Sequence, residues 1–417
     1  MKFLVIGNGG REHAIIWKLA QSPKVDKIYC TLGNAGISKQ AEIINIKVDD
    51  FEALSKFAIE NKIDYTFVGP EVPLALGIVD FFNSKGLKIF GPSKKGALLE
   101  ASKSFAKDFM KKYNVPTADY HTFTDLNKAK QFLETQWEEN KKIVVKADGL
   151  AAGKGVVMCQ NRQQALDALK SIMEDKSFGS AGDTVIFEQW LEGQETSVLV
   201  FVDGKHFSIM PAAQDHKRVN DGDKGLNTGG MGAYAPAPVA TPELLKQVKE
   251  QVMPNIMNGL QKENIDYKGI LYIGFMVDNG NPYVLEFNCR FGDPETQVIL
   301  PLLETDLTDI VEHTINGTLP HRPDRLVLQT AHEGDRHGHA RTLHQHGNPA
   351  VLVPGVSAFP PRVRGDPGEP VRRRRVAPAS RNGAVFPARR LPRNLLLPGC
   401  RDRGCRTRPI WPGTVPA

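Results

Sequence analysis

The stretch KFLVIGNGGREHA, residues 2–14, joins an apolar run to a glycine-rich turn and then to a helical pattern. A short apolar run bounded by a turn is typical of a buried strand. The glycines at positions 7, 9 and 10 let the backbone approach a ligand closely, and the N-terminus of the following helix favours an anion. The stretch predicts a strand, a phosphate-binding turn and a helix; the alternative is a tight turn that only packs the helix on the sheet.

The same turn lacks the fingerprint of a dinucleotide site. The pattern G-x-G-x-x-G requires glycine where Glu12 stands, and no acidic residue closes the second strand at the expected place. The sequence therefore argues against NAD binding and favours binding of the phosphate of a smaller ligand.

Residues 1–92 alternate strand-like runs with helical patterns, which predicts a parallel sheet with helices on its faces. Ligands of such sheets bind at the carboxyl ends of the strands. Glu71 follows the third strand and is a candidate to accept sugar hydroxyls or an amine; the alternative is a solvated loop acid. The expected strands are 2–7, 27–33, 64–69 and 87–91, and the expected helices are 11–21, 51–61 and 74–85.

Residues 93–320 have a mixed α+β pattern without an internal repeat. Strands are expected at 142–147, 183–191, 196–204, 271–278 and 283–288, and helices near 241–262 and 299–316.

KADGLAAGKG, residues 146–155, resembles a phosphate-binding P-loop but fails its pattern. Three residues instead of four separate Gly149 from Gly153, and Lys154 is followed by Gly155 instead of a hydroxyl residue. Lys146 and Lys154 nevertheless bracket flexible glycines, an arrangement suited to a triphosphate. The alternative is a flexible hairpin with surface lysines.

VLEFNCRFGDPE, residues 284–295, places Glu286 and Asn288 on one face of a strand, because side chains alternate. Two oxygen ligands at this spacing can hold Mg²⁺ together with substrate phosphates. Arg290 in the turn beyond can clamp a carboxylate or phosphate; the alternative is a buried Glu–Arg ion pair.

Two further segments carry candidate binding groups. In FEQWLEGQE (187–195), backbone groups of Glu188 and Leu191 could bind an adenine edge and Glu195 could reach ribose hydroxyls, although an ordinary strand end is the alternative. The segment 214–234 is polar and glycine-rich, which within a compact domain usually indicates function. It offers cations at 216–218 and a flexible loop at 227–230, or it is a disordered surface insertion.

The net charge of +6 hides two different regions. Residues 1–320 hold 35 basic and 41 acidic groups, whereas residues 321–417 hold 18 basic groups, all arginine, and 6 acidic groups. Periodic patterning also stops after about residue 325. We interpret the change as a frameshift or chimeric join near 320–335; the alternative is a disordered basic tail that binds nucleic acid.

The remaining composition indicates a chain of a reducing compartment. Five cysteines are scattered without the spacing of a metal site or disulfide framework, and no apolar run approaches the roughly 20 residues of a membrane span.

Six segments, in this order and spacing, resemble the phosphoribosylamine–glycine ligase family of ATP-grasp enzymes: GNGGREHA, GPEVPLALGIVD, KADGLAAGKGVV, QDHKR, NTGGMGAYAPAP and EFNCRFGDPETQ. The resemblance covers about residues 1–320. It implies an N-terminal Rossmann-like, parallel-sheet domain (1–104) followed by an ATP-grasp domain (105–322) with a lid subdomain at about 123–193. The β-rich domain that the family carries next is not recognisable in residues 323–417, an Arg/Pro/Gly-rich segment expected to be irregular.

The resemblance also implies the reaction. ATP, glycine and 5-phosphoribosylamine would give glycinamide ribonucleotide, ADP and phosphate through glycyl phosphate, with Mg²⁺ or Mn²⁺, in cytoplasmic purine synthesis. Partners would be these small molecules, with no nucleic acid and no membrane, and the protein would be a monomer or weak dimer. The alternatives are another ATP-grasp carboxylate–amine ligase, a related biotin-type carboxylase, or an impaired body with a nucleic-acid-binding tail.

By the same resemblance, each candidate residue receives a role. The ATP phosphates would contact Lys107, Lys146, Gly149, Gly153, Lys154 and Gly155. Adenosine would contact Glu188, Leu191 and Glu195, and the metal would be bound by Glu286 and Asn288. The other substrates would contact Gly9, Gly10, Arg11, Glu71, Asp215, Lys217, Asn227, Gly229 and Gly230. The catalytic candidates are Lys146, Arg290 and Asp293, the last two on the glycine side.

Overall fold

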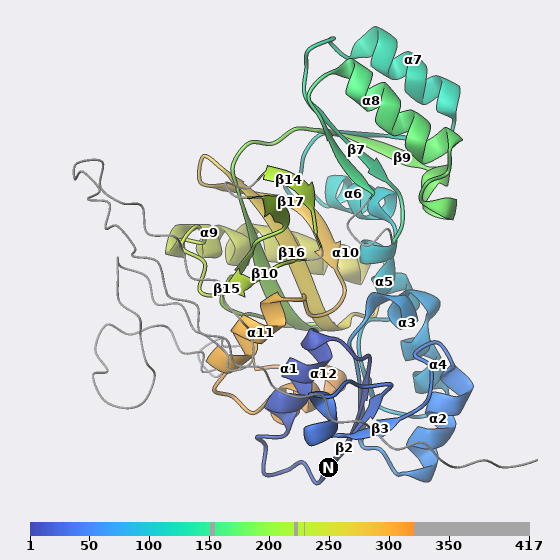
Figure 1. Ribbon diagram of the computed structural model, residues 1–417. Helices are drawn as coiled ribbons and strands as arrows, with labels where there is room; N and C mark the ends of the chain where they lie inside the picture. Colours follow the sequence, from blue (N-terminus) through green and yellow to red (C-terminus); the bar gives the residue numbers. More distant parts are fainter. Residues whose placement is uncertain (151–154, 221–223, 229, 321–417) are drawn as a thin grey trace, which may run out of the picture. The chain divides into compact units, whose positions relative to one another are not determined.

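A computed structural model describes residues 1–150, 155–220, 224–228 and 230–320 (Figure 1). The predictions for the segment after residue 320, and those for Gly153, Lys154 and Gly229, lie outside the described residues. Within the described part, no helix is both long and apolar enough to cross a membrane.

The N-terminal region is a five-stranded sheet in the order β3-β2-β1-β4-β5, and every strand pair is parallel. The predicted parallel sheet is therefore confirmed. The strands are β1 (Lys2–Ile6), β2 (Lys27–Thr31), β3 (Glu42–Ile44), β4 (Tyr65–Val68) and β5 (Ile89–Phe90). The edge strand β3 was not predicted, because its three residues carry too short a pattern to read.

Alternation along β1 divides the core of this region between the two faces of the sheet. Phe3 and Val5 pack in one cluster with α1 (Gly10–Leu19), and Leu4 and Ile6 pack in another with the helices on the opposite face. Those helices are α2 (Phe51–Glu60), α3 (Glu71–Leu76) and α4 (Ile78–Ser84). The single helix predicted at 74–85 is two helices, because Gly77 adopts a left-handed conformation (φ 98°) that ends α3.

Two short helices lead from this sheet into the rest of the chain, α5 (Lys94–Ala101) and α6 (Lys103–Lys112). Ser93 and Ser102 cap them, each accepting a hydrogen bond from a backbone N–H of the first turn. Helix α5 contacts α3 on one side and the long strand β17 on the other.

A small antiparallel sheet follows, in the order β6-β9-β7-β8. Helices α7 and α8 cover one of its faces (Figure 1). The elements are β6 (Tyr120–Phe123), α7 (Leu126–Gln136), β7 (Ile143–Ala147), β8 (Val156–Cys159), α8 (Arg162–Leu169) and β9 (Val185–Gln189), with a π-helical turn at Lys170–Glu174 and a 3₁₀ turn at Gly179–Asp183.

The central sheet is antiparallel, in the order β11-β10-β16-β17. Its long strands are β10 (Gln194–Asp203), β16 (Lys268–Asp278) and β17 (Asn281–Asn288), with β11 (Phe207–Ile209) at the edge. The helices packed around it are α9 (Pro242–Gln247), α10 (Met253–Lys262), α11 (Glu295–Ile299) and α12 (Leu307–Asn316). A π-helical turn, Val248–Val252, joins α9 to α10, and a 3₁₀ turn, Leu300–Leu302, follows α11.

Four short strands lie in the polar segment after β11. They form two antiparallel pairs, β12 (Gln214–Asp215) with β15 (Ala233–Tyr234) and β13 (Arg218–Asn220) with β14 (Lys224–Asn227).

One apolar cluster connects the N-terminal sheet with the central sheet. Phe291, just after β17, lies 6.1 Å from Phe67 of β4 and 6.1 Å from Phe201 of β10, measured between ring centroids. Side chains of α1, α11 and α12 fill the same cluster. The turn after β17 is thus held against the carboxyl end of the parallel sheet, where the candidate residues gather.

Candidate active site

A cavity of about 410 Å³ collects most of the predicted site residues. Its walls come from the small sheet, the central sheet, α5 and α6, and the turns after β1 and β4. The predicted residues that line it are Arg11, Glu71, Lys107, Lys146, Gly149, Gly155, Glu188, Leu191, Glu195, Asp215, Lys217, Glu286, Asn288, Arg290 and Asp293. Gly9 and Gly10 are not in its lining and lie beside Asp293, while Thr228, next to the predicted Asn227, does line it.

Three buried charged side chains, from β7, β9 and α6, form the wall of the cavity on the side of the small sheet. The Glu188 carboxylate on β9 lies 2.8 Å from Lys146 Nζ of β7 and 3.0 Å from Lys107 Nζ of α6. Burial alone raises the pKa of Glu188, but the two ammonium groups outweigh it and lower this pKa. Burial lowers the pKa of Lys107 from 10.5 to about 8, although Glu188 acts in the opposite direction. Two cations thus face one carboxylate, and a net positive charge is left for an anion.

The base of the predicted glycine loop is anchored to the start of α6. Asp148 accepts hydrogen bonds from Ser104 Oγ (2.5 Å), Ser104 N (3.1 Å) and Ser102 Oγ (3.2 Å). Lys103 Nζ donates to the carbonyl of Gly149 (2.8 Å), whose φ of 122° suits glycine. Lys103 is a fourth lysine of the cavity, beside Lys107, Lys146 and Lys217, and motif reasoning missed it; its position on the face of α6 shared with Lys107 was the available signal.

Strand β17 presents the predicted metal ligands to the cavity. Glu286 pairs with Gly274 and Asn288 with Tyr272 of β16, so both lie on the predicted common face. A register shift between β16 and β17 leaves Leu285 without a partner residue on β16, and Leu285 and Phe287 line the cavity as well.

The donor set on β17 fits a hard divalent cation. Burial raises the pKa of Glu286, but Lys217 and Lys146 outweigh it and keep the carboxylate ionised. A carboxylate and an amide oxygen are ligands that Mg²⁺ or Mn²⁺ accepts when phosphate oxygens complete the shell. No group of three or more His, Cys, Asp or Glu that could hold a metal occurs among the described residues.

Arg290 is held by several partners. Its Nη2 lies 2.9 Å from Glu100 Oε1 and donates to Asn288 Oδ1 at 3.0 Å, and its Nε lies 3.5 Å from Glu71 Oε2. The buried Glu–Arg pair left open by the sequence is thus present, with Glu100 as its acid. Burial raises the pKa of Glu100, with Arg290 acting against this rise. Sequence reasoning missed Glu100, since it lies in an ordinary helical stretch 190 residues away.

The glycine turn after β1 is closed by its own helix. Glu12 accepts from Gly9 N (2.6 Å) and from Arg11 Nε (2.7 Å), which explains an acid at the position where the dinucleotide fingerprint has glycine. Arg11 also donates to the Phe291 carbonyl (3.1 Å), and its backbone N–H donates to Asp293 Oδ2 (3.3 Å). Arg11, which follows the glycine turn, and the GDPE segment (residues 292–295) therefore lie together at one wall of the cavity.

Lys217 lies between two acids, Glu195 of β10 in the central sheet and Asp215 of β12. Its Nζ lies 3.4 Å from Glu195 and 3.8 Å from Asp215. Burial acts against its charge, but the groups facing it, Tyr272 and Glu286 foremost, raise the pKa of Lys217 well above its ordinary value. It is a permanent cation beside the β17 ligands.

Tyr272 and Glu295 form a buried polar network that sequence reasoning missed. The Tyr272 hydroxyl bonds to Ser197 Oγ (2.6 Å) and donates to Glu295 Oε1 (3.0 Å). Burial and nearby Asp215 raise the pKa of Glu295. Glu295 closes the same GDPE motif as Asp293, which was the signal available.

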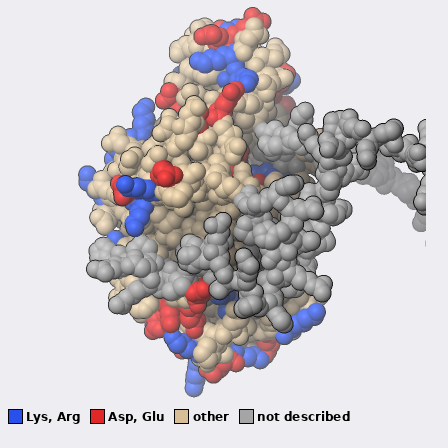
Figure 2. Space-filling model, turned by 90° about the vertical axis from the view of Figure 1, so that its left-hand side faces the viewer, with Lys and Arg blue, Asp and Glu red and all other residues tan. Residues whose placement is uncertain are grey.

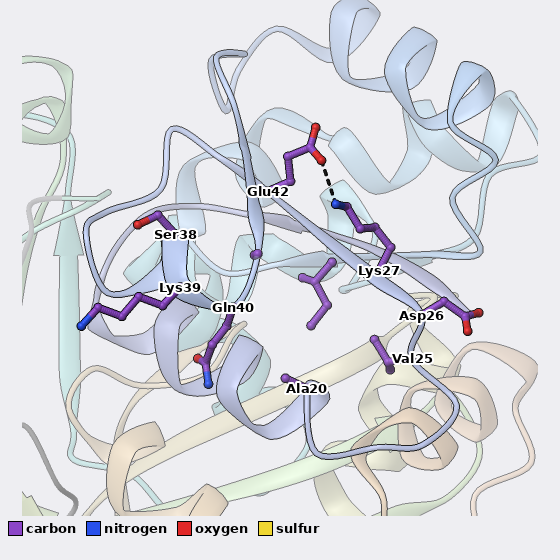
Figure 3. Close-up of a pocket in the computed structure, with 10 residues that line it drawn as sticks. Ala20, Val25, Asp26, Lys27, Ser38, Lys39, Gln40 and Glu42 are labelled. Carbon is purple, nitrogen blue, oxygen red and sulfur yellow. Dashed lines mark ion pairs between the residues drawn. The ribbon is translucent and has the colours of Figure 1, made fainter.

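A second hollow lies away from these residues. It is at the edge of the parallel sheet, between β2 and the segment before β3, where Lys27 and Glu42 pair at 2.8 Å (Figure 3). None of the predicted site residues lines it.

On the face shown in Figure 2, basic and acidic side chains of the described residues are interspersed.

Comparison with known proteins matches this arrangement to one family. The family model for the phosphoribosylglycinamide synthetase N domain matches residues 1–100, and the one for its ATP-grasp (A) domain matches residues 101–296. The phosphoribosylamine–glycine ligase of Caldanaerobacter subterraneus subsp. tengcongensis is 51% identical over 319 residues, 76% of either chain. That of Haemophilus influenzae is 50% identical over 332 residues, 79% of this chain and 76% of the relative.

A solved structure agrees. The crystal structure of phosphoribosylamine–glycine ligase from Thermotoga maritima matches with a TM-score of 0.65 and 30% identity over 76% of each chain. The resemblance inferred from six motifs and the predicted order of a Rossmann-like domain and an ATP-grasp domain are confirmed; the domain limits and the role of each site residue stay predictions. The chain belongs to the phosphoribosylamine–glycine ligase family, ATP-dependent carbon–nitrogen ligases of purine biosynthesis.

Proposed function

We propose that this chain joins glycine to 5-phosphoribosylamine at the expense of ATP, giving glycinamide ribonucleotide, ADP and phosphate. The observation that carries the proposal is the cavity itself. It unites a buried lysine wall, the Glu286–Asn288 strand and the wall where Arg11 and the GDPE segment lie together. A triphosphate, a carboxylate and an amine thus each meet groups of complementary charge.

ATP is proposed to lie between the small sheet and β17. Lys107 and Lys146 supply cations from one side, with Lys103 at the base of the glycine loop. Backbone groups of Glu188 and Leu191 would bind the adenine, and Glu195 the ribose. Because these cations are fixed before the nucleotide arrives, little reorganisation is needed as charge moves between the phosphates.

Glu286 and Asn288 are the residues that would hold Mg²⁺ or Mn²⁺. The cation would neutralise charge on the transferred phosphoryl group. Asn288 is already oriented by Arg290, and Glu286 is ionised, so both oxygens are ready to ligate.

The carboxylate of glycine would attack the γ-phosphorus of ATP, forming a P–O bond as the bond to ADP breaks. The amine nitrogen of phosphoribosylamine would then attack the acyl carbon of glycyl phosphate, and phosphate would leave while the amine loses a proton. Arg290 and Asp293 are proposed on the glycine side; Gly9, Gly10, Arg11 and Glu71 are proposed to face phosphoribosylamine. Positioning of three ligands in one cavity supplies most of the acceleration.

The remaining assignments follow from the same proposal. The substrates are small molecules, no nucleic acid is required, and a cytoplasmic monomer or weak dimer is expected. Asp215, Lys217, Asn227 and Gly230 are proposed as further substrate contacts.

The test is ADP formation by the full-length chain, measured with a coupled assay. It should require both glycine and phosphoribosylamine. Glu286→Ala should abolish it, whereas Glu52→Gln, a change in an exposed pair with Lys85, should leave it unchanged. ADP release without either substrate, or full activity of Glu286→Ala, would contradict the proposal.

A further inference from the structure

Glu100 contacts the end of the metal strand in two ways. One carboxylate oxygen accepts a hydrogen bond from the backbone N–H of Cys289 at 2.7 Å. The other lies 2.9 Å from Nη2 of Arg290. Cys289 is between the proposed ligand Asn288 and Arg290, so one side chain on α5 fixes both the main chain and the guanidinium of this turn.

The guanidinium in turn fixes the amide of Asn288. Arginine has only donors, so the atom of Asn288 that faces Nη2 at 3.0 Å must be its oxygen. A single Nη2 group therefore connects Glu100 with the proposed ligand oxygen. Of these two contacts of Nη2, only the one with the Glu100 carboxylate holds it toward α5.

Glu71 does not substitute for Glu100. It lies 3.5 Å from Arg290 Nε, and this nitrogen makes no hydrogen bond among the described residues. The side chain of Glu71 is 32% exposed, whereas that of Glu100 is 8% exposed. Glu71 is thus placed to contact a substrate, and Glu100 is placed to hold the arginine.

We propose that Glu100 is a positioning residue for the metal site: it holds Arg290, and through it the Asn288 oxygen, in the orientation that binds the divalent cation. This inference rests on the proposed role of Glu286 and Asn288 as metal ligands. It assigns Glu100 no contact with substrate.

The experiment separates metal-dependent from metal-independent nucleotide binding. ADP is titrated into the full-length chain by calorimetry, once with Mn²⁺ and once with EDTA, and the ratio of the two affinities is the contribution of the metal. Glu100→Gln keeps the volume, but its one amide oxygen can accept either from the Cys289 N–H or from Arg290 Nη2, and its NH2 group then faces the other donor. We expect the ratio to fall about tenfold, the usual effect of losing a group that orients a ligand, with the affinity in EDTA unchanged.

Glu263→Gln is the matched control. Glu263 also accepts from two partners, Lys112 Nζ at 2.5 Å and Tyr113 OH at 2.7 Å, but it does not line the cavity. Its ratio should equal that of the unmodified chain. If Glu100→Gln fails to fold, Glu100→Asp, which keeps the charge but is one methylene shorter, should show a smaller loss of the ratio.

The outcomes distinguish the two levels of inference. An unchanged ratio in a folded Glu100 variant, or an equal loss with Mn²⁺ and with EDTA, overturns the positioning role. An unmodified chain without metal enhancement, or Glu286→Ala with undiminished enhancement, overturns the proposed ligands and this inference with them. Arg290→Lys combined with Glu100→Gln should lose no more than Arg290→Lys alone; additive losses would show that Glu100 does not act through Arg290.

Discussion

Glu188→Gln is the perturbation whose effect the structure determines most directly. The substitution keeps the shape of the side chain and removes the one carboxylate that faces both Lys107 and Lys146. The side chains of the three residues are at most 9% exposed, so water cannot replace the lost charge. Removing one partner of a buried ion pair costs about 3–5 kcal/mol, which for a chain of this size lowers the melting temperature by about 5 °C.

The pH dependence makes the expectation specific. Lys107 already carries a penalty of about 3 kcal/mol for its charge, worked from a pKa lowered from 10.5 to about 8. Without Glu188 the pKa of Lys107 falls further. At a pH between this lower pKa and 8, Lys107 of the folded variant has lost its proton, whereas Lys107 of the unfolded variant keeps it. In the unmodified protein Lys107 is protonated in both states over this pH range. Stability of the variant then rises with pH in that window, and the deficit relative to the unmodified protein shrinks by about 1.4 kcal/mol per pH unit.

Thermal and urea unfolding between pH 6 and pH 8.5, followed by circular dichroism, measures this deficit. Glu188 stays ionised over that range in the unmodified protein, because its pKa is lowered. Glu192→Gln is the control, since its pair with Lys142 is exposed and should give no measurable change. A deficit that is absent at pH 7, or that does not shrink as the pH rises, would refute the electrostatic account of this wall.

Two further substitutions test other parts of the fold. A Cβ at Gly69 would lie 2.0 Å from Glu12 Oε1, so Gly69→Ala should displace Glu12 from Gly9 and raise the KM for phosphoribosylamine several-fold in steady-state assays, with the KM for ATP unchanged. Asp203→Ala removes the acceptor of the backbone N–H of Leu319 (2.8 Å) at a buried position and should destabilise the protein by about 2–3 kcal/mol in urea unfolding; an unchanged midpoint would contradict this.

Local patterns in the sequence predicted four of the five strands of the parallel sheet and most of the segments that line the cavity. The strand after Met1 ends at a glycine turn, and β4 ends at the loop before Glu71, so the rule that parallel strands present their carboxyl ends together placed both segments correctly. Alternation likewise placed Glu286 and Asn288 on one face.

Contacts between distant segments were not readable in the same way. Lys146 and Glu188 each lie in a predicted strand, but nothing in either strand indicates that β7 and β9 are neighbours, or that Lys107 of α6 pairs with Glu188. The bulge at Leu285 also escapes a strict two-residue period, because it depends on how β17 pairs with β16.

The charge balance of the wall formed by Lys107, Glu188 and Lys146 affects how tightly a nucleotide binds. Before a nucleotide is present, two buried ammonium groups need a counter-ion, and Glu188 supplies one negative charge for two positive ones. A triphosphate brings more negative charge than the wall lacks, so the surplus must be met by the remaining cations of the cavity or by a bound divalent cation. The wall is therefore stable without nucleotide yet still attracts it. At a pH below the further lowered pKa of Lys107, where both lysines are charged, Glu188→Gln should then tighten the binding of metal-free ADP while weakening the fold, which separates the stabilising role of this carboxylate from any direct contact with the nucleotide.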